Sequence, residues 1–264
     1  MKAREKKQKN TGRRLGVLSW VLIGLGGAGF ALALVMVVRI GLEYSAAQNE
    51  YTSLREGYVS KAAENPGEAG GEAQPSVVDL RALQALNSDC VAWLELPGVE
   101  IEYPVLRGGD NDYYLNHTFE RAQNASGAIF MDFRSSADFT DGHSLIYGHN
   151  MLDGSMFSGL DRYQDNAFLA ENPMLYIHLN DVLYTCTVVA AGRVPADDPL
   201  YGMLGGGAAQ AGALAEAAAE RLGALLAGFD PADYTKEDRF LTLSTCTATG
   251  DGVQRDIAVA VLGR

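Results

Sequence analysis

The chain has 264 residues and a formal net charge of −12 that is unevenly distributed. Residues 1–14 contain seven Lys or Arg and one Glu, a charge of +6, so residues 15–264 carry −18. So acidic a segment argues against general nucleic-acid binding, because phosphate contacts require clustered Lys and Arg. Three cysteines without a CxxC pair argue against a disulfide framework or a zinc ribbon.

Residues 15–38 contain no charged side chain and predict one membrane-spanning helix. Twenty-four helical residues extend about 36 Å, which covers a hydrocarbon core of about 30 Å. The basic residues 1–14 precede this stretch, so the positive-inside rule predicts a cytoplasmic N-terminus and an extracellular remainder. The alternative is a cleaved signal peptide, whose apolar core is normally only about 7–15 residues long.

Residues 39–76 predict an extracytoplasmic stalk. A polar helix is expected over residues 40–60, and residues 64–76 form a linker rich in Gly, Pro and Glu that has no apolar side chains to bury. We therefore expect the folded domain to occupy residues 77–264. Its first element is a helix over residues 78–86, where apolar residues recur at helical spacing.

The folded domain is predicted to be mainly β, a closed eight-stranded β-barrel with peripheral helices. Apolar and β-branched runs separated by turn residues predict the strands, and Asn180-Asp181 marks one hairpin between them. The Ala-rich residues 208–226 predict a helix lying on the barrel, with a low-complexity linker as the alternative. The expected strands are 91–96, 100–107, 127–131, 144–148, 174–179, 182–193, 239–246 and 255–262.

The last two strands form a predicted hairpin that brings a cysteine beside an arginine. Turn residues Thr249-Gly-Asp-Gly252 separate the strands, and a hairpin centred on residues 250 and 251 sets Cys246 opposite Arg255. Directly opposed residues of an antiparallel pair have Cβ atoms about 5 Å apart. The hairpin therefore places a thiol next to a guanidinium.

Cys246 is the strongest candidate for a reactive group. Side chains alternate along a strand, so Cys246 shares a polar face with Thr242 and Ser244. A free thiol with a pKa of about 8.5 is mostly protonated at neutral pH, and a neighbouring cation lowers that pKa. Because Arg255 stays charged at any physiological pH, the pairing favours the nucleophilic thiolate.

A cysteine nucleophile also needs a group that exchanges protons, and four histidines are available. His149 directly follows a predicted strand and Gly148, in a loop of the kind that often carries functional groups. A structural role for His149 stays open on spacing alone. His178 falls inside a strand and is expected to pack or face solvent, while His117 and His143 lie in polar loops and are expected to be solvated.

The other cysteines and the common cofactor motifs indicate no second site. Cys90 and Cys186 lie in or beside predicted strands and are expected to be small buried hydrophobes. We expect no metal, because the sequence has no HxxxH or CxxC ligand pair. GxSxG and P-loop patterns are absent, and the glycines at 205–207 lack the following Lys and Ser or Thr.

Taken together, residues 242–246, Arg255 and residues 147–151 resemble a class B sortase, a Gram-positive cell-surface transpeptidase. The resemblance covers nearly all of the predicted domain. Two departures are Cys90, where the family more often has Thr or an aliphatic residue, and the Ala- and Gly-rich residues 205–228. The other segments that resemble this class are Asn87-Ser-Asp with Trp93, and residues 101–105, 110–115 and 127–134.

The resemblance implies roles for individual residues. Cys246 would attack a scissile bond in the C-terminal sorting signal of a secreted protein and form a thioester. His149 would act as general acid and then general base, and Arg255 would steady the oxyanion or the substrate backbone. Ser244, Asn111 and Leu115 would line the substrate groove and bind the substrate. The acceptor would be an amine of the peptidoglycan cross-bridge, with no cofactor and no metal.

Three alternatives share these sequence features. A pilin-polymerising sortase would use a lysine side chain as acceptor, and such enzymes often carry a second membrane span or a lid, neither of which is evident here. A non-catalytic surface-anchored barrel would not need Cys246, His149 and Arg255 together. A thiol hydrolase would use water in place of the amine.

Overall fold

The computed structural model describes residues 5–61, 74–204, 209–235, 237–246 and 253–263. Most of the predicted linker at 64–76 and the turn at 249–252 lie outside these residues. The chain divides into two compact units, Met1–Ala46 and Ala47–Arg264. The barrel and every site considered below belong to the second unit.

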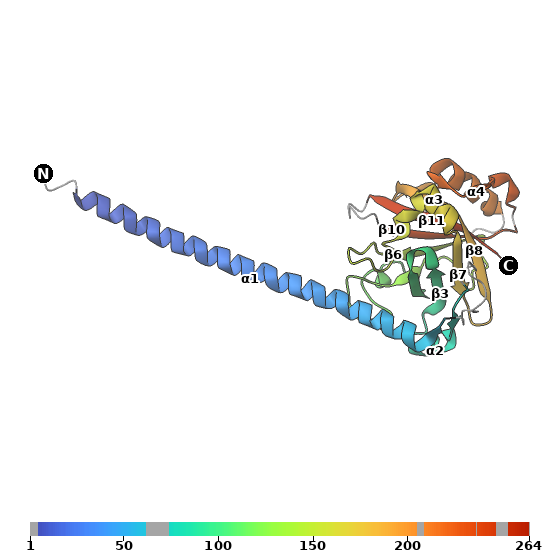
Figure 1. The fold of residues 1–264 in the computed structure, drawn as a ribbon, viewed down its shortest axis with the longest axis horizontal. Helices are drawn as coiled ribbons and strands as arrows, with labels where there is room; N and C mark the ends of the chain where they lie inside the picture. The colour runs from blue at the N-terminus through green and yellow to red at the C-terminus, as the bar shows by residue number, and fades with distance from the viewer. Residues whose placement is uncertain (1–4, 62–73, 205–208, 236, 247–252, 264) are drawn as a thin grey trace. The chain divides into compact units, whose positions relative to one another are not determined.

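A single helix, α1, runs from Glu5 to Tyr58 (Figure 1). It contains both the predicted apolar span at residues 15–38 and the polar helix predicted over residues 40–60. By length and composition, it is the one helix within the described ranges that could cross a membrane, with a mean hydropathy of 2.5 over its most apolar stretch. The helical conformation predicted for both stretches is therefore confirmed.

The last turns of α1 belong to the barrel unit. Ala47, Tyr51 and Leu54 are spaced along one helical stripe, and each is at most 4% exposed. The compact unit consequently starts at Ala47 and not near Val77, because this stripe is buried against the domain. We call residues 47–58 the docking turns.

Removing the docking turns is expected to destabilise the barrel. A chain that starts at residue 77 loses the burial of two large side chains, Tyr51 and Leu54, each worth about 1.5–3 kcal/mol. For a domain of this size, we expect a melting temperature lower by on the order of 10 °C than that of a chain starting at residue 47. Thermal unfolding followed by circular dichroism measures the difference. A chain starting at residue 40 is the control and should melt with the chain starting at residue 47; equal melting of all three would show that the docking turns contribute no stability.

All eight strands expected from the sequence are present, and they form the barrel. Each observed strand overlaps its predicted range, with ends that differ by at most a few residues. The strands are β3 (Cys90–Leu96), β4 (Ile101–Leu106), β5 (Ile129–Met131), β6 (His143–Gly148), β7 (Met174–His178), β8 (Leu183–Pro195), β10 (Phe240–Cys246) and β11 (Gln254–Leu262).

The strand order closes the sheet on itself. Around the barrel the order is β11-β10-β6-β5-β4-β3-β7-β8, and β8 pairs again with β11. The β4–β5 and β6–β10 pairs are parallel, and the other pairs are antiparallel. Closure leaves no open edge among these eight strands. The predicted closed, mainly β barrel is confirmed.

Several helices and short strands lie outside the eight-stranded barrel. The Ala-rich segment forms α4 (Ala209–Arg221), shorter than the predicted 208–226 because residues 224–225 pair with β8 as β9. The buried face of α4 packs on residues of β8, β10 and β11, beside which it is drawn in Figure 1. The remaining elements are β1 (Val59–Ser60), β2 (Val77–Val78), α2 (Leu80–Leu86), α3 (Asn166–Glu171), β9 (Ala224–Leu225) and the 3-10 helices Pro97–Val99, Tyr113–Leu115, Leu160–Gln164, Pro199–Gly202 and Pro231–Asp233.

Candidate active site

Three adjacent strands bring the predicted catalytic residues to one end of the barrel. Cys246 of β10 pairs with Arg255 of β11 across the antiparallel ladder, which is the register predicted from the hairpin. β6 runs parallel to β10 with Gly148 beside Thr245, and His149 follows β6 directly. Because neighbouring strands lie about 4.8 Å apart, the backbones of His149, Cys246 and Arg255 are side by side. The side chain of Cys246 lies outside the described part of the structure.

Contacts with two neighbouring segments fix the position of His149. The ring nitrogen Nε2 lies 2.6 Å from the carbonyl oxygen of Leu115. A carbonyl oxygen only accepts hydrogen bonds, so Nε2 carries the hydrogen in this contact. The backbone oxygen of His149 accepts a 2.9 Å hydrogen bond from the N–H of Phe157. The 3-10 helix that ends at Leu115 therefore holds the imidazole, and the turn that leads to Phe157 holds the backbone of His149.

Arg255 lies near the start of β11, between two strands. It pairs with Cys246 on one side and with Val194 of β8 on the other. Its side chain is half-buried, and Nη1 donates a 2.9 Å hydrogen bond to the carbonyl of Gln254. A guanidinium has five N–H donors in a fixed fork and can bind more than one acceptor at a time.

The predicted polar face of β10 is buried in the protein and not open to solvent. Ser244 is 1% exposed, and its hydroxyl lies 2.8 Å from that of Tyr201. Thr242 is 2% exposed, and its hydroxyl lies 2.8 Å from Nε2 of His143. The segment around Tyr201 and Met203 covers this part of the strand. Sequence reasoning missed this cover, because no local pattern shows which distant segment packs on a strand face.

Asn111 and Leu115, two further predicted groove residues, differ in how available they are. The amide of Asn111 donates to Oδ2 of Asp132 at 2.9 Å and accepts from the N–H of Phe133 at 3.0 Å. Burial opposes ionisation of Asp132, but hydrogen bonds from Arg134 and Asn111 outweigh it and lower the pKa of this carboxyl. Asn111 therefore serves a buried carboxylate network, whereas the side chain of Leu115 is 41% exposed.

His143 was predicted to be solvated, and this prediction is wrong. The residue is 1% exposed and opens strand β6, because the strand begins one residue earlier than expected. Nδ1 lies 3.0 Å from the carbonyl of Met203, which can only accept, so Nε2 accepts from the hydroxyl of Thr242. Both ring nitrogens are thus used by a neutral imidazole. Burial lowers the pKa of His143 to about 4.

The depressed pKa of His143 predicts a loss of stability in acid. An unfolded chain takes up the proton below the usual histidine pKa of about 6.5, while the folded chain resists protonation down to about 4. Stability should therefore fall as the pH is lowered from 6.5 towards 4, by on the order of 3 kcal/mol for this group. Urea unfolding of wild type and His143→Gln at pH 7 and pH 4.5 measures this, and the difference between them should shrink in acid. His117→Gln is the control; an equal pH slope in all three proteins would contradict the prediction.

The other two histidines have structural partners. His178 is 7% exposed and its Nε2 lies 3.3 Å from Oε1 of Glu95, so the expectation that it packs is confirmed. His117 is half-buried and not fully solvated as predicted, because its ring stacks on Tyr113 at a centroid distance of 4.1 Å. Neither contact reaches His149 or the end of β10.

Cys90 and Cys186 are buried, as predicted. They are 1% and 0% exposed, and burial raises the pKa of each thiol to about 12. Both are free cysteines. Neither has the thiolate character that a nucleophile or a metal ligand requires. Among the described residues, no cluster of three or more His, Cys, Asp or Glu side chains is arranged to hold a metal ion.

Comparisons with known proteins match the barrel. A family model described as a sortase domain matches residues 94–263. Sortase B of Listeria monocytogenes is 48% identical over 95 residues, which are 36% of this chain and 39% of that protein. Sortase B of Staphylococcus aureus is 33% identical over 117 residues, 44% of this chain and 48% of that protein. The matched stretch spans less than half the length of either relative.

Solved structures match a larger part of this chain than the sequence relatives do. A Staphylococcus aureus sortase B–substrate complex has a TM-score of 0.63 and 27% identity, over 70% of this chain and 84% of that one. Sortase B from Listeria monocytogenes has a TM-score of 0.59 and 32% identity, over 69% of this chain and 99% of that one. A Streptococcus pyogenes class B sortase involved in pilus biogenesis has a TM-score of 0.61 and 27% identity, over 70% of this chain and 98% of that one.

The family model covers well over half of the chain, including β10, β11 and His149. Its match and the class B structural neighbours agree with the closed eight-stranded barrel. The chain belongs to the sortase family, as the sequence resemblance indicated, and its relatives within that family are class B sortases.

Proposed function

We propose that this chain is a cysteine transpeptidase that cleaves a C-terminal sorting signal of secreted proteins. It transfers the acyl group to an amine of the peptidoglycan cross-bridge. The observation that carries the proposal is the register of three strands that are neighbours in the sheet, β6, β10 and β11. That register sets His149, Cys246 and Arg255 side by side at one end of the barrel. Membership of the sortase family supports the same chemistry.

The reaction proceeds in two steps. The Cys246 thiolate attacks the carbonyl carbon of a Thr–Gly or Thr–Asn bond, a C–S bond forms, and the C–N bond breaks. His149 gives a proton to the departing amine. An incoming amine then attacks the thioester and loses a proton to His149, and the thiolate leaves. Arg255 donates hydrogen bonds to the oxyanion that develops in each step.

The predicted groove residues take different parts in this proposal. Leu115 is the best supported as a direct contact, because its side chain is partly exposed and its carbonyl lies against the His149 ring. Ser244 and Asn111 are bonded inside the protein. They therefore shape the groove by supporting β10 and the Asp132 network.

The site would act at the outer face of the cell membrane. The apolar part of α1 is the anchor, and the basic residues 1–14 hold the N-terminus in the cytoplasm. The barrel then meets secreted substrates and the cell wall. The charge of −18 carried by residues 15–264 suits sorting tails that are neutral or basic.

Intact-mass spectrometry of the full-length chain in detergent micelles tests the proposal. The chain is incubated with synthetic sorting peptides carrying a Thr–Gly or Thr–Asn bond. We expect an acyl adduct on Cys246 that disappears when triglycine is added, with a peptide–glycine product. Absence of an adduct with every peptide would overturn the proposal.

A pilin-type acceptor is the second candidate, favoured by the similarity to the Streptococcus pyogenes enzyme involved in pilus biogenesis. Lysine-containing peptides offered in place of triglycine distinguish the two acceptors. Faster transfer to lysine than to glycine would favour the pilin reaction. Release of the free acid with both acceptors would identify a hydrolase.

A further inference from the structure

Two segments flank His149, and both are contacted by the docking turns of α1. One segment is residues 113–127, whose Leu115 carbonyl accepts the imidazole hydrogen bond. The other is the turn after His149, residues 150–157, closed by the Asn150–Met156 bridge. The docking turns lie outside residues 94–263, the part matched by the sortase family model. Their contacts therefore add to what family membership implies.

Tyr51 holds the first segment through Gly127. Its hydroxyl donates a 2.8 Å buried hydrogen bond to the Gly127 carbonyl. Gly127 has a φ of +56°, and a Cβ at this position would lie 2.6 Å from the carbonyl oxygens of Tyr114 and Leu115. The backbones of residues 114–115 and 127 are thus in direct contact. We expect a shift of Gly127 to move the Leu115 carbonyl that orients His149.

A second contact fastens the same segment. The carboxylate of Glu50, one residue before Tyr51, accepts a 2.8 Å hydrogen bond from the backbone N–H of Glu120. Adjacent positions on α1 therefore bind both ends of the stretch from residue 120 to residue 127. The helix fixes this stretch as a unit.

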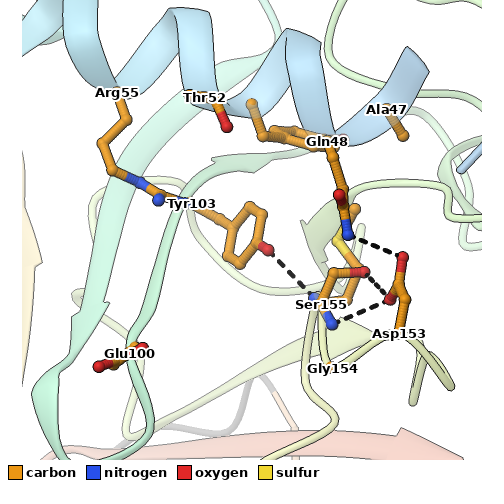
Figure 2. A pocket seen from close by; sticks show the side chains of 11 residues that line it. Ala47, Gln48, Thr52, Arg55, Glu100, Tyr103, Asp153, Gly154 and Ser155 are labelled. Carbon is orange, nitrogen blue, oxygen red and sulfur yellow. Dashed lines mark hydrogen bonds between the residues drawn. The ribbon is translucent and has the colours of Figure 1, made fainter. Parts of the chain in front are cut away.

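Gln48 holds the second segment. Its Nε2 donates a 3.0 Å hydrogen bond to Oδ2 of Asp153, while Oδ1 of Asp153 accepts from the N–H and the hydroxyl of Ser155 (Figure 2). Tyr103 of β4 adds a further link. Its hydroxyl accepts from the N–H of Met156 at 3.1 Å, and its ring packs edge-on against Tyr51 at 5.1 Å.

A cavity of about 230 Å³ separates the helix from this turn. Gln48, Tyr103 and Asp153 line it, and the sticks in Figure 2 reach across it. The Gln48–Asp153 hydrogen bond crosses this space, and the buried Tyr51–Tyr103 contact lies beside it. We expect loss of the Gln48–Asp153 hydrogen bond to move the turn at this point.

We propose that the docking turns position the catalytic histidine, with Tyr51 and Gln48 as positioning residues that hold the two segments on either side of His149. The role rests on the proposed transpeptidase function. In that reaction His149 must reach both the departing and the incoming amine, and small misplacements of a catalytic group are costly. α1 is then a component of the active site in addition to a tether.

The test uses the full-length chain in detergent micelles and two independent changes. Tyr51→Phe removes only the hydroxyl, and Gln48→Glu sets a second carboxylate against Asp153. Each is expected to lower kcat on the order of tenfold or more with the KM for the sorting peptide unchanged. The double variant Gln48→Glu with Asp153→Asn exchanges donor and acceptor across the same hydrogen bond and should restore kcat. Ser53→Ala is the control, because its hydroxyl is exposed and donates to the Asn49 carbonyl of its own helix.

Selective 15N-histidine NMR supplies a readout that needs no turnover. The ring signals of His149, assigned from their loss in His149→Gln, should show a hydrogen on Nε2 in wild type. In Tyr51→Phe and Gln48→Glu they should shift, while the signals of His178 stay in place. If both variants keep wild-type His149 signals, the positioning role is overturned, whatever their melting temperatures. If wild type forms no acyl adduct, the proposed function fails, and the NMR comparison still decides whether the docking turns position the ring.

Discussion

Cys246→Ala is expected to form no acyl adduct with any sorting peptide and to lose turnover by a factor on the order of 10⁴ or more. In the proposed mechanism the sulfur forms the thioester bond of the intermediate, and alanine has no atom that replaces it. Because residue 246 is the last of β10, the substitution leaves the ladder of that strand intact. We expect the melting temperature to change by only about 2 °C. Intact-mass spectra and circular dichroism on the same samples measure both quantities.

Cys90→Ala is the matched control for this prediction. It removes a thiol that is buried in β3, with its pKa raised to about 12. The variant should lose about 1 kcal/mol of stability and still form the adduct with the rate of wild type. An acyl adduct on Cys246→Ala would show that another residue is the nucleophile. The same conclusion would follow if folded Cys90→Ala formed no adduct.

Arg255→Lys is expected to lower kcat/KM about a hundredfold, the scale of losing one oxyanion donor. The charge is kept, so the loss measures the fork of donors and not electrostatics alone. Nη1 of Arg255 donates to the Gln254 carbonyl, and the planar fork can hold two acceptors in fixed directions. The lysine ammonium lacks this fork of donors in fixed directions. It is therefore less able to bind the Gln254 carbonyl and the substrate oxygen together.

Arg239→Lys is the control for this substitution. Arg239 lies at the other end of the same hairpin, where its guanidinium donates to the Phe139 carbonyl and the Tyr184 hydroxyl at 3.2 Å. It should lower the melting temperature and leave kcat/KM close to wild type. Steady-state cleavage of a fluorogenic sorting peptide measures the two variants side by side. A rate for Arg255→Lys near that of wild type would remove Arg255 from the mechanism.

Local patterns predicted the strands and two pairings between them, β7 with β8 and β10 with β11. β-branched and apolar runs between turn residues mark each strand, and pairing by a short turn is local, so the Cys246–Arg255 register followed from counting residues about residues 250 and 251. The parallel pairing of β6 with β10 joins residues about a hundred positions apart. Periodicity does not specify a partner at that distance. His149 was therefore a candidate from its position in a loop, and its place beside Cys246 came from the fold.

Burial of polar stretches was the main feature that the sequence did not predict. His143 follows acidic and small residues typical of a loop, but the segment at Met203 covers it. The docking turns contain charged residues typical of a solvent-exposed stalk. Their signal was the spacing of Ala47, Tyr51 and Leu54, which is too sparse to distinguish a buried stripe without its partner surface.

The burial of two of the three cysteines has a practical consequence. Cys90 and Cys186 are shielded from solvent and stay protonated at neutral pH. A mild alkylating reagent applied to the native protein should therefore modify a single position, Cys246. The moles of label incorporated then count the competent enzyme molecules in a preparation. Covalent inhibitors and fluorescent reporters can therefore be attached to this chain without first replacing Cys90 or Cys186.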